Sequence, residues 1–181
     1  MTPQAKETRI LATDQKIYAR LFEAIIENNI RKMHAVLKKY RFDEIDTNLA
    51  LSAAVELNNL SATKLLLKHG ADRLTKDSCG RIVLHKAHSK QMVDLLLQQN
   101  TMEQIDAKDH CGNTPLEHMR TKRLNSESQF EALDAVLKHA SVESKNRFLN
   151  TPTTNNLRIE YPNNHFRQMN YHRGIRKGFS R

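Results

Sequence analysis

Residues 109–117 read DHCGNTPLE, and residues 77–85 read DSCGRIVLH. Both stretches contain the pattern D-x-C-G, and each has a leucine four residues after its glycine. Gly80 and Gly112 lie 32 residues apart, so they mark the same place in two successive units. A fixed period of this length predicts a repeat architecture in which each unit packs on its neighbours.

A ladder of leucines supports the same interpretation. Leu37, Leu67 and Leu97 are spaced by 30 residues, and polar residues follow each of them. Leu137 comes 40 residues later, which places an insertion in the last unit, around residues 122–128. Two ladders with nearly one period favour a stack of similar units over a single closed globule.

Each unit has the pattern of two short helices. Thr114 can cap a helix that begins at Pro115, and Glu117 can complete a capping box with Thr114. Gly70 follows the leucine-rich stretch of the second unit, where a left-handed residue ends a helix, and Asn100 takes the equivalent place in the third. Helices of two or three turns are marginal alone, so we expect packing between units to stabilise them.

The fold class predicted is therefore all-α, a solenoid of about four helix-turn-helix units. The expected units are 16–46, 47–76, 77–108 and 109–141, between an N-terminal extension, 1–15, and a basic C-terminal tail or cap, 142–181. The later helix pairs are expected at 49–57 with 61–69, 82–87 with 90–99, and 115–123 with 127–139.

Three stretches, GNTPLE (112–117), LLLKHGAD (65–72) and GRIVLHKA (80–87), resemble the ankyrin repeat. The resemblance covers roughly residues 16–141 and departs from the family where Ile82 and Val83 replace Thr-Pro. It implies a turn followed by two antiparallel helices, with the turns forming a row of fingers. It also implies a histidine, His85, that binds neighbouring backbone, and partners bound along the fingers and the concave first-helix face.

On this basis the chain is predicted to be a protein–protein interaction module. The candidate partner-binding residues are polar or cationic residues of the fingers and first helices. They are Arg73, Lys76, Ser78, Arg81, Lys86, His88, Lys108, His110, Asn113, His118 and Lys122. Their positive charge predicts a partner with an acidic surface.

Other chemistries have little support. The sequence has no nucleophile elbow, phosphate loop or dinucleotide glycine motif, and the segments outside the repeats are too short for a catalytic domain, so we expect no enzyme and no cofactor. The spacing of Cys79, His85 and His88, with His110 and Cys111 nearby, is not a standard zinc pattern. We expect no metal site and two free thiols.

The alternative function is binding of nucleic acid or anionic lipid by the C-terminal tail. Residues 151–181 hold six cationic residues against one acid, Glu160, within a chain of net charge +9. Four aromatic residues are interleaved with the arginines, a pattern that can stack on bases while the charges meet phosphates. The candidate phosphate contacts are Arg167, Arg173, Arg176, Lys177 and Arg181.

Features that the sequence lacks also bear on where the protein acts. No run of ten apolar residues, no signal sequence and only two cysteines are found, which predicts a cytoplasmic monomer. In style, the basic, Asn-rich chain also resembles small ankyrin proteins that intracellular bacteria deliver into host cells, which would make it an effector acting on a host protein.

Overall fold

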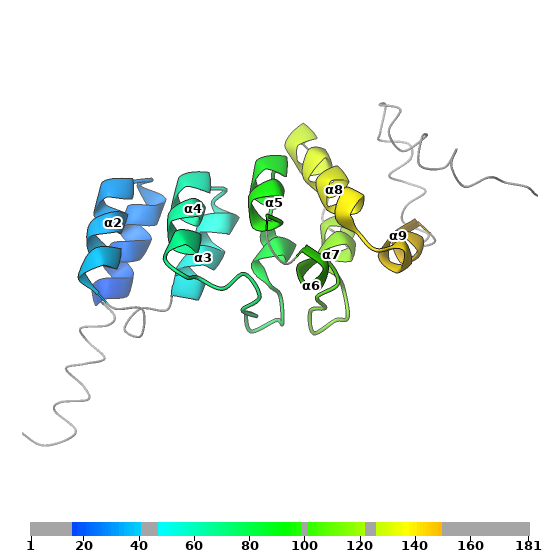
Figure 1. Ribbon diagram of the computed structural model, residues 1–181, viewed down its shortest axis with the longest axis horizontal. Coiled ribbons are helices and arrows are strands. Elements are labelled where there is room, and N and C mark those ends of the chain that lie inside the picture. The colour runs from blue at the N-terminus through cyan, green and yellow to red at the C-terminus, as the bar shows by residue number, and fades with distance from the viewer. Residues whose placement is uncertain (1–15, 41–46, 99–100, 122–125, 150–181) are drawn as a thin grey trace, which may run out of the picture.

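The computed structural model describes residues 16–40, 47–98, 101–121 and 126–149. Within this part of the chain every regular element is a helix, and the helices lie in two rows along one long axis (Figure 1). The first row contains residues 16–26, α3 (Thr47–Glu56), η2 (Val83–Lys86) and α7 (Pro115–Thr121). The second row contains α2 (Ile30–Lys39), α4 (Leu60–Lys68), α5 (Lys90–Leu96) and α8 (Glu127–His139).

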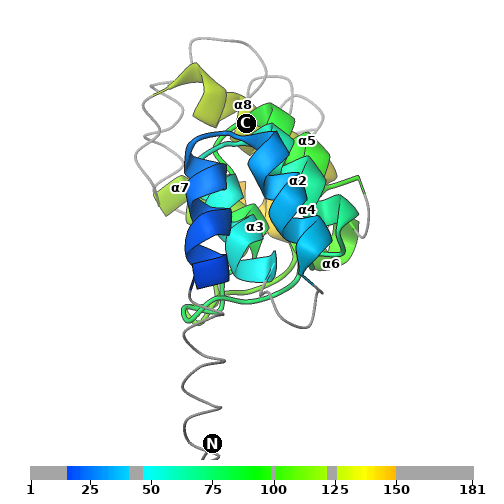
Figure 2. The same ribbon diagram turned by 90° about the vertical axis from the view of Figure 1, so that its left-hand side faces the viewer.

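The two rows are distinct when the stack is viewed end on (Figure 2). From α3 to α7 and from α2 to α8, each element packs on the next one in its own row, and α3 with α4 and α7 with α8 also pack across the two rows. This is the arrangement of an ankyrin-type solenoid, and it confirms the predicted fold class. No helix in the described ranges has both the length and the apolar character needed to cross a membrane.

The turns between paired helices are built the same way in the first two units. Asn28 and Asn58 take left-handed conformations, with φ of 51° and 53°, which asparagine tolerates better than most residues. The next residue in each case caps the second helix: Asn29 Oδ1 accepts from Lys32 N, and Asn59 Oδ1 accepts from the first turn of α4, both at 3.0 Å. One side chain thus satisfies an orphan N–H at each helix start.

Later units use hydroxyl caps. Ser89 caps α5, and the predicted capping box at α7 is confirmed. Thr114 N donates to Glu117 Oε2 at 2.9 Å, while Thr114 Oγ1 accepts from Glu117 N at 3.4 Å. Ser126 caps α8, as its place before the helix predicts. Gly70 has φ of 88° and ends the second unit's helix in the expected left-handed conformation.

The core is a continuous row of apolar side chains between the two helix rows, with alanines interspersed among leucine, isoleucine, valine and methionine. Three of the four ladder leucines are buried, namely Leu37, Leu97 and Leu137. Leu67 is half-buried. Hydrogen bonds also join successive units: Asn59 Nδ2 donates to the Ile25 carbonyl at 3.0 Å.

The third unit differs from the prediction in three places. The helix expected at 82–87 is a single 3₁₀ turn, η2, because Ile82 offers no side-chain cap to start an α-helix. The helix expected at 90–99 ends at Leu96. A further short helix, α6 (Thr101–Ile105), was not predicted. Asn100 lies outside the described residues.

A last helix, α9 (Val142–Leu149), follows the fourth unit inside the segment that the sequence assigned to a tail or cap. It packs against α7 at the end of the stack (Figure 1). Phe148 is fully buried, and Ser144 Oγ donates to Asp106 Oδ1 at 2.7 Å. This helix therefore covers apolar surface that the terminal repeat would otherwise expose.

Replacing Phe148 with Ala should test this capping role. The change removes a fully buried ring and should lower the free energy of unfolding by about 3 kcal/mol, measured by urea denaturation. The matched control is Val142→Ala on the same helix, since Val142 is 75% exposed and should change stability little. Equal effects of the two substitutions would contradict the assignment.

Candidate partner-binding surface

Two loops at the same edge of the stack form the fingers, defined here as residues 77–81 and 109–113 (Figure 1). In the first finger, Asp77 Oδ1 accepts hydrogen bonds from Cys79 N and Arg81 N, both at 2.9 Å. The backbone closes the same turn, because Gly80 N donates to the Asp77 carbonyl at 2.9 Å. One aspartate therefore organises the whole finger.

The second finger repeats this geometry. Asp109 Oδ1 accepts from Cys111 N at 2.9 Å and from Asn113 N at 2.8 Å. Gly80 and Gly112 have φ of 75° and 79°, so both turns need a residue that adopts the left-handed region readily. The D-x-C-G pattern is thus explained as an aspartate that accepts two backbone bonds plus a left-handed glycine.

The fingers also bind each other. His110 N donates to the Cys79 carbonyl at 2.9 Å, and Lys76 Nζ donates to the Lys108 carbonyl at 3.3 Å. His85 Nε2 lies 3.1 Å from the Asn113 carbonyl. A carbonyl only accepts, so Nε2 carries the proton. Burial lowers the pKa of His85 and the Asn113 carbonyl opposes this, so the ring is neutral at pH 7. The role implied by the ankyrin resemblance is confirmed.

A paired substitution should separate turn strain from contact between fingers. Alanine at Gly80 or Gly112 meets the same left-handed strain, about 1 kcal/mol. A Cβ at Gly80 would also lie 2.9 Å from His110 N and still closer to the His110 ring, whereas a Cβ at Gly112 has open space around it. Gly80→Ala should therefore cost about 1–3 kcal/mol more than Gly112→Ala in thermal or urea unfolding.

Lys86 joins three elements behind the first finger. It is 8% exposed, and its Nζ lies 2.6 Å from Ser52 Oγ, 2.9 Å from Glu56 Oε1 and 3.1 Å from Asp77 Oδ2. Burial alone would raise the pKa of Asp77. Hydrogen bonds from the Arg81 backbone and side chain, from Lys86 and from the Cys79 backbone outweigh this effect, so the pKa of Asp77 is well below its ordinary value of 3.8. Arg81 completes the network at 2.9 Å from Asp77 Oδ2.

This network predicts a pH dependence. Because the folded state lowers the pKa of Asp77, its stabilisation is fully present above the unfolded pKa, near 4, and is lost as pH falls below that value. Asp77→Asn should cost about 3 kcal/mol at neutral pH, since it leaves Lys86 with one carboxylate and breaks the finger.

Asp94→Asn is the matched control, because Asp94 is an exposed acid on α5. Urea unfolding at neutral and acidic pH should show the loss for Asp77→Asn at pH 7 and a smaller difference from wild type near pH 3. A difference that does not shrink on acidification would mean that the Asp77 charge is not the source of the stability.

The structure separates the predicted partner-binding residues into groups. Four are exposed on or beside the fingers: Lys76, Ser78, Lys108 and His110. Asp77 binds the side chains of Arg81 and Lys86, and Asp109 binds that of Asn113. His118 lies 3.7 Å from Asp109, and its ring is edge-on to the ring of His85. His88 is half-buried.

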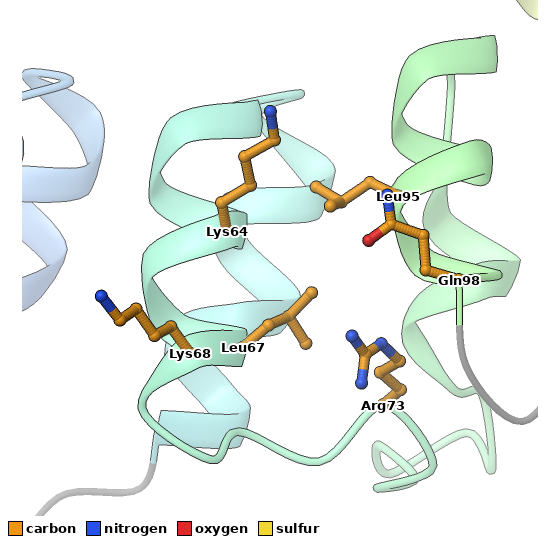
Figure 3. A pocket seen from close by; sticks show the side chains of 6 residues that line it. All are labelled: Lys64, Leu67, Lys68, Arg73, Leu95 and Gln98. Atoms are coloured by element: carbon orange, nitrogen blue, oxygen red, sulfur yellow. The ribbon is translucent and has the colours of Figure 1, made fainter.

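Arg73 turns into the gap between α4 and α5 (Figure 3). Lys122 and the tail candidates, Arg167, Arg173, Arg176, Lys177 and Arg181, lie outside the described residues.

Sequence reasoning missed an apolar part of this surface. Among the described residues, five large hydrophobic side chains are strongly exposed, and three of them belong to the first two units of the first row. These are Ile26, Leu49 and Leu57, at 70%, 55% and 54% exposure. Leu49 lies outside the period set by the buried residues Ala50, Leu51 and Ala54 on α3, whereas Ile26 and Leu57 lie where the first helices of their units end.

Cys79 and Cys111 are both free and exposed in the fingers, as predicted. Within the described residues no group of three histidine, cysteine or acidic side chains is arranged to hold a metal ion.

Comparison with known proteins supports the ankyrin resemblance. The chain is 36% identical over 97 residues to neurogenic locus notch homolog protein 1 of mouse and of Chinese hamster, an alignment that covers 52% of this chain and 4% of each relative. It is 28% identical over 108 residues to an ankyrin repeat protein of Rickettsia bellii, covering 55% of this chain and 59% of that protein. No protein-family model matches the chain. The chain is thus similar to ankyrin-repeat proteins and spans only part of the relatives it matches.

Proposed function

We propose that this protein binds a partner protein through one continuous surface made of the outward side of the first helix row and the two fingers. The observation that carries the proposal is the exposed apolar set Ile26, Leu49 and Leu57. Apolar area left in water is stabilised when a partner covers it, by roughly 25 cal/mol for each Å². Exposed apolar side chains concentrated in two adjacent units favour a contact surface there.

These three side chains can be covered together. Leu49 lies in the first turn of α3, and Leu57 directly follows its last residue. Ile26 follows Ile25, whose carbonyl accepts the Asn59 amide, so Ile26 and Leu57 lie at the same end of neighbouring units. A partner laid across this end of the two units would contact Ile26 and Leu57, and one that also extends along α3 would reach Leu49.

The polar part of the surface lies on the fingers of the later units. His110 is exposed on a finger and Lys76 and Lys108 directly precede the fingers, and the two lysine charges stay available because Asp77 and Asp109 bind other groups. Apolar anchors beside a cationic rim are the usual composition of a protein-binding interface. The partner that fits has an apolar segment flanked by acidic residues, and we propose binding, not catalysis, as the activity.

Affinity purification from the native cell, followed by quantitative binding to the partner so identified, tests the proposal. Leu49→Asp with Leu57→Asp should weaken binding at least about thirtyfold, because charges replace two apolar anchors. Met102→Asp with Val142→Asp is the matched control, since both residues are exposed hydrophobic side chains away from this surface. Loss of the partner in both double variants, or in neither, would rule out the proposed surface.

The cationic residues beside the fingers need a separate variant to test their part in binding. Arg81→Glu would place a second carboxylate against Asp77 and disturb the finger, so it cannot report binding alone. Lys108→Glu avoids this problem, because the Lys108 side chain is exposed; Lys76 is left unchanged, since its Nζ donates to the Lys108 carbonyl. It should slow association and reduce the salt dependence of binding if the partner is acidic.

Delivery into a host cell as a bacterial effector is a separate proposal. Its support is the similarity to an ankyrin repeat protein of Rickettsia bellii. A translocation reporter fused to the chain that stays outside host cells during infection would contradict it. No observation on the described residues favours the nucleic-acid alternative.

A further inference from the structure

A pocket opens on the opposite side of the stack, between α4 and α5 of the second row (Figure 3). Its volume is about 310 Å³, at the small end of the range for ligand sites. The lining residues are Lys64, Leu67, Lys68, Arg73, Leu95 and Gln98.

The pocket has a cause in the helix lengths. α4 and α5 begin 30 residues apart, at Leu60 and Lys90, but α4 continues to Lys68 whereas α5 ends at Leu96. The last two residues of α4 therefore have no helical equivalents in α5. Leu67 stays half-buried for this reason, although its equivalents in the ladder are buried.

The charges around the pocket all have one sign. Lys64 and Lys68 lie one turn apart on α4, and like charges at this spacing repel each other. Neither lysine has a carboxylate within 4.0 Å among the described residues, and both are exposed. The proximity of these two lysines therefore destabilises the fold, and no ion pair within the described part of the chain compensates for it.

Arg73 is the fixed cation of the group. Its guanidinium points into the gap between Leu67 and Gln98 (Figure 3). Burial lowers its pKa while Asp72 opposes this change, yet a guanidinium remains charged at neutral pH. The Asp72 carboxylate is engaged in its own turn, accepting from Leu74 N at 2.9 Å and lying 3.2 Å from Thr75 Oγ1.

We propose that this pocket binds a phosphate monoester, carried either by a small soluble molecule or by a lipid headgroup. The Arg73 fork matches two phosphate oxygens, and the flexible lysine side chains can swing from the rim to the remaining charge. The Gln98 amide adds a neutral donor, and Leu67 with Leu95 contacts the apolar part of the ligand. Three cations suit a phosphate of charge near −2 better than a single carboxylate.

This site is independent of the protein-binding surface, since it lies on the second helix row. Calorimetry with inositol monophosphate, and sedimentation with phosphatidylcholine vesicles with and without phosphatidylinositol phosphate, would measure binding by the full chain. Lys68→Gln with Arg73→Gln should weaken binding at least about tenfold, because it removes two charge-assisted contacts.

The control must remove equal charge elsewhere, because the chain is basic overall. Lys38→Gln with Lys90→Gln does so, since both are exposed lysines outside the pocket lining. If Arg73 proves necessary for folding by circular dichroism, Lys64→Gln with Lys68→Gln replaces it as the pocket variant.

Each outcome of the binding experiment has one interpretation. Loss in the pocket variant alone supports the site. Binding of inositol monophosphate then assigns a soluble ligand, and binding of vesicles alone assigns a lipid headgroup. Equal loss in pocket and control variants would reduce the effect to general attraction by a basic chain, and no binding by wild type to either probe would also overturn the proposal.

Discussion

The constraint on which the structure depends is that no helix pair can cover its own apolar side. Helices of seven to thirteen residues, such as α5 and α8, are too short to be stable alone. Each pair therefore depends on the next, and the hydrogen bonds between units follow the same rule, as between His85 and the Asn113 carbonyl. Among the described residues the fourth unit is followed by α9, which supplies Phe148 in place of another helix pair.

Much of the fold followed from the sequence because the repeated residues have local roles. Thr114 with Glu117 predicted a helix start from short-range hydrogen bonds, and the D-x-C-G pattern predicted the same place in two successive units. The predictions failed where contacts with a neighbouring element or unit determine the local structure. Ile82 gives η2 no cap, so only one 3₁₀ turn forms there, and α6 with α9 depends on surfaces that other units create.

The candidate surface was harder to predict because residue type alone does not show which charges are available. Lys86 and Arg81 resemble free surface cations in the sequence, yet Asp77 binds both. Lys76 and Lys108 remain exposed. In the other direction, Leu49 looks like a core leucine until the period of α3 places Ala50 and Ala54 inward, and Leu57 is exposed because it follows the last residue of that helix.

Repetition also gives meaning to the exceptions. Where every unit must fill the same space, a shortened helix leaves a gap that its equivalents do not have, and the early end of α5 does so beside Leu67. An apolar gap alone would favour repacking, since unfilled space costs dispersion energy. The cations Lys64, Lys68 and Arg73 around it oppose that repacking, because closing the gap would desolvate like charges together. The repulsion among these cations therefore keeps the pocket open, and a bound anion would relieve the same repulsion.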